Sequence, residues 1–353
     1  SPLAIIGGMY RRLAVYPFDC SEQVSDAVLP LIALYRAGAA PGGRSFAPPN
    51  ARQEIEKAVA VLSRRQRPDG GIGLWAADDW TTPWLSAHAG EALLAARDAG
   101  VAVSDSVLVR LGAYLFQSVH QRRPLGGPLT WWFTNVRVRF AEDVAAVDYL
   151  SRLGRADRAG ENELLRVAPQ LAWEDRVRLA GVVARRGATE AARRILVPIW
   201  AGVRIEGRRA VLSDSAARSF YFSSWRRPLA RLLSATLAVD SAHALIGPLV
   251  ETLVEQGRTA RRQWWNTQDY GAAVQALADF TARQQRAIRR GFTVAGAGRV
   301  LFRTPREGDV MREVSRNLTG LLVDAPGGSK RLTLAIVAPF SANPAPLYYY
   351  VTV

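Results

Sequence analysis

Residues 85–115, LSAHAGEALLAARDAGVAVSDSVLVRLGAYL, contain two apolar stretches joined by a short link. The first stretch stops at Gly100, and glycine readily adopts the left-handed backbone that ends many helices. The second stretch starts at Ser104, and its apolar residues recur at the spacing of one helix face. These residues are Val107, Leu108, Leu111 and Leu115. The segment therefore predicts a helical hairpin.

Similar apolar segments follow one another from residue 1 to about residue 287. Ile55, Val59 and Leu62 again form one helix face. Further segments lie at residues 144–153, 177–183, 191–197, 229–237, 244–254 and 272–280. The alternation that is typical of strands is almost absent there, apart from residues 203–212. Paired helices with short links predict a mainly α domain over residues 1–287, either an α/α solenoid or a closed toroid of hairpins.

The character of the sequence changes near residue 290. Short apolar runs, several of them rich in β-branched and aromatic residues, are separated there by turn-forming clusters of glycine, proline and asparagine. The runs lie at residues 299–303, 318–323, 332–337 and 347–353. We predict a small β-rich module over residues 288–353. Because the last run reaches Val353, we expect further chain to complete its sheet.

The composition is that of a folded globular protein, with 49% hydrophobic and 22% charged residues among 353. The net charge of +15 could indicate nucleic-acid binding. However, the arginines are scattered as pairs without interleaved aromatic residues, so we expect no nucleic-acid partner. No run of 18 or more apolar residues occurs, and Ser1 is not followed by a basic, apolar leader. We expect any signal peptide or membrane anchor to lie outside these residues.

Cys20 is the single cysteine, which excludes an internal disulfide and a multi-cysteine zinc site. Its role must be packing or reactivity. The pair Asp78 and Asp79 has no third ligand at a useful spacing, so we interpret it as a solvated loop. We therefore expect neither a metal ion nor a cofactor.

The sequence around Cys20 reads YPFDCSEQ over residues 16–23 and lies between two apolar helical stretches. It resembles the aromatic-Pro-aromatic-Gly-Cys-x-Glu-Gln motif of the alpha-2-macroglobulin and complement thioester proteins. The resemblance implies that the Cys20 sulfur and the Gln23 carbonyl form a thioester with loss of ammonia, while Tyr16, Pro17 and Glu22 complete the motif. A turn entering a helix can bring side chains three residues apart together. Asp19 stands where the family usually has glycine.

Four further stretches resemble the same family and occur in the same order along the chain. They are residues 64–75 (RRQRPDGGIGLW), 84–87 (WLSA), 265–269 (WNTQD) and 346–349 (PLYY). The resemblance implies the thioester-bearing α/α toroid of a bacterial alpha-2-macroglobulin, followed by part of a CUB-like module. We then expect Trp75, Trp84 and Trp265 to pack between helices. Cys20 and Gln23 should lie at an exposed or partner-covered edge.

The same resemblance implies a protease inhibitor with a single-turnover thioester rather than an enzyme. Its partners would be target proteases, bound covalently through surface lysines, and the other macroglobulin-like domains of the parent chain. Its location would be the periplasm, with a lipid anchor outside these residues. His120 is the best candidate for a nucleophile relay, but its surroundings do not match the complement motif. We therefore expect direct aminolysis. Lysine is scarce in the chain, where only Lys57 and Lys330 occur.

Two enzymatic alternatives remain open from the residues alone. Residues 66–75 also resemble a repeat of the terpene cyclases, which are α/α toroids as well, although the chain lacks their Asp-x-Asp-Asp acid motif. Cys20 could instead act with a histidine in acyl transfer, and His88, His120 and His243 are present. We interpret each histidine as an ordinary helix residue. Cys20 could also be an inert buried cysteine.

Overall fold

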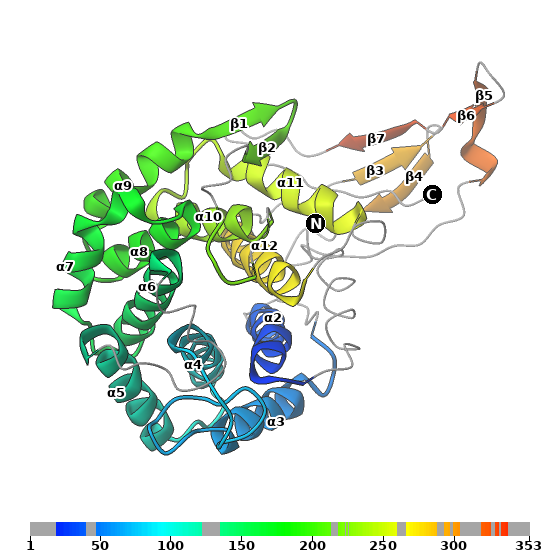
Figure 1. Ribbon diagram of the computed structural model, residues 1–353. Coiled ribbons are helices and arrows are strands. Elements are labelled where there is room, and N and C mark those ends of the chain that lie inside the picture. Colours follow the sequence, from blue (N-terminus) through cyan, green and yellow to red (C-terminus); the bar gives the residue numbers. More distant parts are fainter. Residues whose placement is uncertain are drawn as a thin grey trace.

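The computed structural model describes residues 19–39, 47–121, 135–212, 218–222, 224, 226–259 and 266–287, together with short segments between 293 and 337. Its helices alternate along the chain between an inner and an outer layer (Figure 1). The inner helices are α2 (Ser21–Ala39), α4 (Pro83–Asp98), α6 (Val136–Arg152), α8 (Trp173–Arg185), α10 (Arg226–Val239) and α12 (Thr267–Ala287). The outer helices are α3 (Ala51–Arg64), α5 (Asp105–Gln121), α7 (Arg158–Arg166), α9 (Thr189–Ala201) and α11 (Ile246–Thr259).

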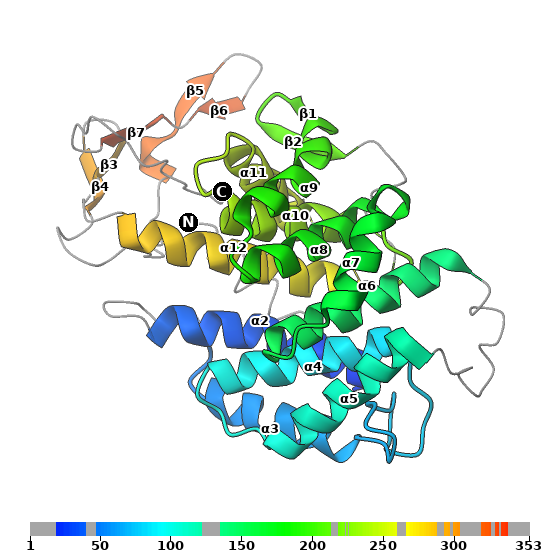
Figure 2. The ribbon, with the colours of Figure 1, turned by 90° about the vertical axis from the view of Figure 1, so that its left-hand side faces the viewer.

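Each inner helix packs against the next inner helix, and α12 packs back against α2. Figure 2 shows α2 and α12 lying side by side, although they come from opposite ends of the helical region. The inner layer is therefore a closed ring, and the predicted α/α toroid of hairpins is confirmed. A solenoid, the open alternative, would leave α2 and α12 apart.

The predicted hairpin of residues 85–115 is formed by α4 and α5. Thr82 caps α4, because its hydroxyl accepts a hydrogen bond from the Leu85 N–H at 3.0 Å, and Pro83 occupies the first turn. After α4 the chain turns at Gly100, whose φ of +80° is costly for residues with a Cβ. The cap and the glycine together fix where the hairpin reverses.

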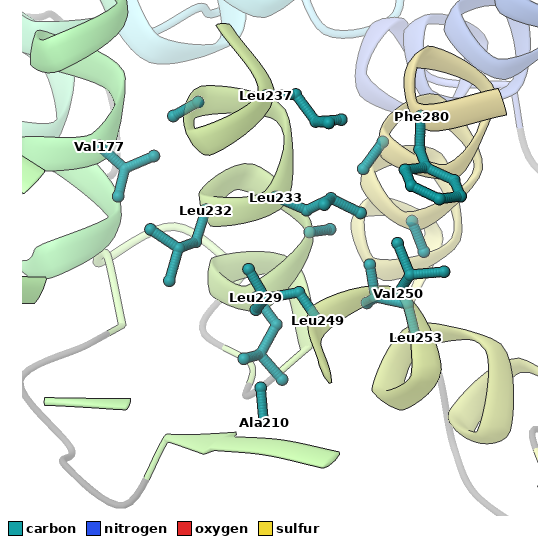
Figure 3. Packing of buried hydrophobic residues seen from close by; sticks show 14 of the residues in the cluster. Val177, Ala210, Leu229, Leu232, Leu233, Leu237, Leu249, Val250, Leu253 and Phe280 are labelled. Atoms are coloured by element: carbon teal, nitrogen blue, oxygen red, sulfur yellow. The ribbon is translucent and has the colours of Figure 1, made fainter. Parts of the chain in front are cut away.

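The apolar core lies between the helices of the ring, in two large clusters. One unites α8 to α12 with the strand β2, and Figure 3 shows Leu229, Leu233, Val250 and Phe280 meeting in it. The other unites α2 to α6. Burial of these side chains supplies the main stabilisation of the ring, at about 25 cal/mol per Å² of apolar surface removed from water.

Residues 203–212, the one alternating stretch in the helical region, form the antiparallel strands β1 (Val203–Glu206) and β2 (Arg209–Leu212). Thr252 of α11 ties this hairpin to the toroid. The Ala210 N–H donates to Thr252 Oγ1 at 2.8 Å, and the hydroxyl donates to the Ala210 carbonyl at 3.0 Å. The edge of β2 is thereby covered by a helix.

A β-rich region follows α12, as the sequence predicts. The strands β3 (Thr293–Gly296), β4 (Arg299–Arg303) and β7 (Leu334–Val337) form an antiparallel sheet in the order β4-β3-β7. The strands β5 (Val323–Ala325) and β6 (Ser329–Arg331) form a separate hairpin. Residues 319–321 are a short 3₁₀ helix rather than part of a strand. The predicted run at residues 347–353 lies outside the described residues.

Among the described residues, no helix combines the length and the apolar character needed to cross a membrane.

Close packing of α4 against α6 depends on Gly90. A Cβ at this position would lie 2.4 Å from Tyr149 Cε2 and 2.8 Å from Leu111 Cδ2, so Gly90→Ala should lower the free energy of unfolding by about 1–3 kcal/mol through overpacking. Gly181, in α8, is the matched control. Its Cβ would meet only Arg185 Nη1 at 3.6 Å, so Gly181→Ala should be neutral or stabilise by about 0.5–1 kcal/mol. Urea unfolding of both variants measures the difference, and equal effects would contradict this packing.

Candidate functional site

Cys20 stands at the position that precedes the first residue of α2, and its carbonyl accepts the first helical hydrogen bond from the Val24 N–H at 2.9 Å. Gln23 is the third residue of the helix. Its side-chain Oε1 accepts a hydrogen bond from the Cys20 N–H at 3.2 Å. This is half of a capping box, in which a side chain of the first turn reaches back to the capping residue. The Gln23 carboxamide is therefore folded back onto Cys20.

The loop between α3 and α4 holds this helix end in place. The Ser21 N–H donates to the Leu74 carbonyl at 2.7 Å, and the Ser21 hydroxyl donates to the Gly73 carbonyl at 2.6 Å. Gly73 has no room for a side chain, since a Cβ would lie 1.9 Å from the Ala76 carbonyl oxygen. The glycine-rich stretch of residues 70–73 thus serves to bring backbone acceptors against the start of α2.

Asp19, which stands where the family usually has glycine, is exposed to solvent. Arg65 holds it, because one guanidinium nitrogen donates to the Asp19 carbonyl at 2.7 Å and another lies 3.6 Å from its carboxylate. The turn into α2 therefore tolerates the aspartate.

Cys20 is a buried free thiol, 7% exposed. Burial raises the pKa of the Cys20 thiol, with a smaller opposing contribution from a backbone hydrogen bond involving Gln23. The Cys20 thiol donates a long hydrogen bond to Glu22 Oε2, at 3.9 Å. A neutral thiol beside a carboxyl group does not resemble the thiolate–imidazolium pair of a cysteine enzyme.

A buried polar network extends from Glu22 into the ring. Glu22 Oε1 accepts hydrogen bonds from Thr267 Oγ1 at 2.9 Å and from Gln268 Nε2 at 3.0 Å. The same Gln268 nitrogen lies 2.8 and 2.9 Å from the two carboxylate oxygens of Asp26. Asp26 is also bonded to His88 Nε2 at 2.9 Å. The network therefore joins α2, α4 and α12 directly behind Cys20.

Protonation in this network is set mainly by loss of water. Burial, assisted by the charge of Asp26 and a hydrogen bond with it, raises the pKa of Glu22 from 4.5 to about 9. Burial raises the pKa of Asp26 to about 6, against the opposing effect of hydrogen bonds from Glu22 and Thr267. Burial lowers the pKa of His88 to about 4. At neutral pH, Glu22 is protonated, Asp26 is ionised and His88 is neutral.

The sequence did not reveal this cluster, although signals for it exist. Asp26 follows Glu22 by four residues and so shares its helix face. His88 follows Trp84 by four residues and stacks on it with ring centroids 5.3 Å apart. Gln268 belongs to the WNTQD stretch. Only the closure of the ring brings these three segments together.

His120, the candidate relay, lies at the end of the outer helix α5. Its Nε2 is 2.8 Å from Asp157 Oδ2, and its ring contacts Phe116 with centroids 4.4 Å apart. In the described part of the chain, none of these partners is shared with Cys20. Tyr16, Pro17 and Trp265 lie outside the described residues.

The expected packing of the tryptophans is only partly right. Trp84 is 5% exposed and stacks on Tyr221 with centroids 4.7 Å apart. Trp75, in contrast, is 48% exposed, so the prediction that it packs between helices is wrong. The backbone N–H of Trp75 donates to the Asp79 carboxylate at 3.1 Å, in a turn that leaves the indole exposed. The prediction that Cys20 lies at an exposed or partner-covered edge is not confirmed, because residues of the chain itself bury it. Gln23 is half-buried, and Asp19 is exposed.

The centre of the ring contains a cavity of about 200 Å³. Charged and apolar side chains share its wall. Arg178 bridges Asp148 at 2.7 Å and Glu91 at 3.1 Å, and Arg152 and Arg231 also line it. A terpene cyclase requires a deep apolar cavity for its hydrocarbon substrate. The charged lining argues against that alternative. The described residues contain no cluster of side chains suited to a metal ion.

Comparison with known proteins places this architecture. No family model matches the chain. A curated alpha-2-macroglobulin homolog from Yersinia pestis is 33% identical over 109 residues, which are 31% of this chain and 5% of that protein. Over these 109 residues the chain is similar in sequence to an alpha-2-macroglobulin. The crystal structure of Salmonella alpha-2-macroglobulin reacted with methylamine matches 85% of the chain with a TM-score of 0.63 and 19% identity.

A second solved structure, native alpha-2-macroglobulin from Escherichia coli spanning domain MG7 to the C-terminus, matches 86% of the chain with a TM-score of 0.63 and 19% identity. The likeness of both structures concerns the fold. The chain covers 18% of the Salmonella structure and 45% of the Escherichia coli structure. It therefore corresponds to one region of much longer proteins.

The protonation of Glu22 should be visible in the stability of the protein. A carboxyl with a raised pKa stabilises the fold fully below its unfolded value of 4.5, and this contribution is lost as the pH rises through about 9. In a Cys20→Ala background, which cannot form a thioester, the free energy of unfolding should contain a component that falls by up to about 1.4 kcal/mol per pH unit. Adding Glu22→Gln should remove this component. Urea unfolding measures the free energy of unfolding of both proteins at each pH. If the two values change with pH in parallel, Glu22 is not the protonated group.

Proposed function

We propose that this chain carries the reactive site of a covalent protease inhibitor, in which a thioester joins Cys20 Sγ to the Gln23 side-chain carbonyl carbon. The observation that carries the proposal is the folding back of the Gln23 carboxamide onto Cys20 at the start of α2. The capping box explains this contact as helix chemistry alone. The motif resemblance and the likeness to alpha-2-macroglobulins favour the reactive interpretation.

The chemistry follows from the position of the bond. The Cys20 sulfur adds to the Gln23 carbonyl, and ammonia leaves. The resulting thioester is an activated acyl group, which a primary amine opens to give an amide on Gln23 and a free thiol on Cys20. The Cys20 N–H, which donates to Gln23 Oε1, and the positive end of the α2 dipole favour the negative charge that develops on this oxygen.

Burial protects the proposed thioester from hydrolysis until the protein is activated. Water competes with amines for any activated acyl group, and Cys20 is almost closed to water. Two related structures are described as activated by proteases, Escherichia coli alpha-2-macroglobulin by trypsin and by porcine elastase. By analogy, we propose that cleavage elsewhere in the parent chain exposes the thioester to lysines on the attacking protease. The other macroglobulin-like domains of that chain would supply the trigger.

The inhibitor would act once per molecule and would need no cofactor. We also propose a periplasmic location, with a lipid anchor outside these residues.

The bond itself can be tested by mass. Native full-length protein should weigh about 17 Da less than its sequence requires, because ammonia is lost. Methylamine should then release one thiol. Cys20→Ala should have the unmodified mass and release no thiol. An unmodified mass with a freely titrating thiol in native wild-type protein would refute the proposal.

The preferred acceptor can be tested separately. Because His120 is bonded to Asp157 on the outer layer, we expect direct attack by amines and no acyl-imidazole intermediate. Protein activated by a protease in the presence of equal methylamine and glycerol should yield mainly the amide, and His120→Ala should leave this ratio unchanged. Efficient ester formation that disappears in His120→Ala would show that His120 takes part.

A further inference from the structure

The leaving group of the proposed thioester is the Cys20 sulfur, and its buried environment disfavours the negative charge that forms there. Opening the bond puts an electron pair on the Cys20 sulfur, which is buried. A buried charge without a partner is costly, and burial already raises the pKa of this thiol. A proton donor beside the sulfur would remove the charge as it forms.

We propose that Glu22 is the acid–base residue of the Cys20–Gln23 site, giving a proton to the sulfur when the bond opens and taking it back when the bond closes. The inference rests on the proposed function. Glu22 Oε2 lies 3.9 Å from Cys20 Sγ, within hydrogen-bond reach for sulfur.

The two oxygens of Glu22 have separate environments. Oε1 accepts two hydrogen bonds, from Thr267 and Gln268, which anchor the carboxyl to α12. Oε2 lies 3.9 Å from the sulfur, and the Glu22 carboxyl group also shares a hydrogen bond with Asp26, so the proton must leave that hydrogen bond to reach the sulfur. An acidic residue in the first turn of a helix often serves only to stabilise the helix dipole, and it is then solvated. Glu22 is 3% exposed and hydrogen-bonded to a helix from the other end of the domain. Dipole stabilisation alone does not explain this arrangement.

The opening reaction then balances. The amine nitrogen forms a bond to the Gln23 carbonyl carbon, the carbon–sulfur bond breaks, and its electron pair stays on Cys20 Sγ. The proton of Glu22 Oε2 moves to the sulfur. The proton that the attacking amine nitrogen loses on becoming an amide restores the Glu22 carboxyl group, directly or through water. Closure, with ammonia as the departing amine, is the same sequence in reverse, so one residue serves both directions.

The charges around Glu22 favour its protonated state before the reaction. On α2 it faces ionised Asp26, on α4 neutral His88, and on α12 the uncharged Thr267 and Gln268. Arg227 and Arg231 of α10 lie beyond Asp26 and lower its pKa. The nearest charge to Glu22 is thus negative, which disfavours a second carboxylate.

The test uses the full-length native protein and the rate of thiol release by methylamine. Glu22→Gln keeps the size and the hydrogen bonds to Oε1 but cannot donate the proton, so release should slow about 10²-fold, within the usual range for general acid catalysis. Glu142→Gln is the control. Glu142 is another carboxyl whose pKa burial raises, to about 7, and it bonds Tyr221 rather than the sulfur. Its variant should react at the wild-type rate.

The outcomes separate this inference from the proposed function. If wild type shows neither the mass deficit nor thiol release, the thioester itself is refuted. If wild type shows both and Glu22→Gln reacts equally fast, the thioester stands and the role of Glu22 is overturned. If Glu22→Gln folds with the wild-type urea midpoint but lacks the mass deficit, the closing step requires Glu22, as proposed.

A measurement on wild type alone covers the case in which Glu22→Gln does not fold. Hydroxylamine is a nucleophile that is already uncharged at neutral pH, so its own protonation does not affect the rate there. Thiol release should fall as the pH rises through the pKa of Glu22, about 9. A rate that stays constant or rises through this range would overturn the role of Glu22.

Discussion

The hydrogen bonds from Thr267 and Gln268 on α12 to Glu22 and Asp26 on α2 close the ring, and the site depends on them. They join residues more than 240 positions apart in the sequence. Apolar packing alone would allow α2 and α12 to slide or rotate against each other. Polar groups buried without partners are costly, so a network of many buried hydrogen bonds favours one register, even though Nδ1 of His88 has no partner. That register sets the position of the α2 N-terminus, and with it Cys20.

The interior of the toroid is organised by polarity. Apolar side chains fill the space between the helices, whereas the hole of the ring holds paired charges such as Arg178 with Asp148 and Glu91. Arginine suits this role better than lysine because its planar fork bonds two carboxylates at once. Arginine, which far outnumbers lysine in this chain, therefore has a structural use at several positions. Such buried pairs are weak evidence for stability and better evidence for a defined geometry.

The sequence predicted the hairpins but not how they join. Helix spacing and helix ends are local properties, so α4 and α5 could be located directly from the stop at Gly100 and the apolar face of α5. That face consists of Val107, Leu108, Leu111 and Leu115. Closure is a property of the whole ring, and periodicity alone could not choose between a toroid and a solenoid. For the same reason, Cys20 and Gln23 could be found from their spacing, whereas His88 and Gln268 could not. Trp75 was misjudged because its motif says nothing about which way a loop side chain points.

The proposed function depends on one covalent bond, between Cys20 and Gln23. The most direct measurement is tandem mass spectrometry of the tryptic peptide of residues 13–36, taken from native full-length protein after methylamine treatment. A thioester predicts an N-methyl group on Gln23, about 14 Da heavier than the unmodified side chain, and a Cys20 thiol that thiol reagents label only after the treatment. An unmodified Gln23 together with a Cys20 thiol that is labelled equally well before treatment would contradict the account.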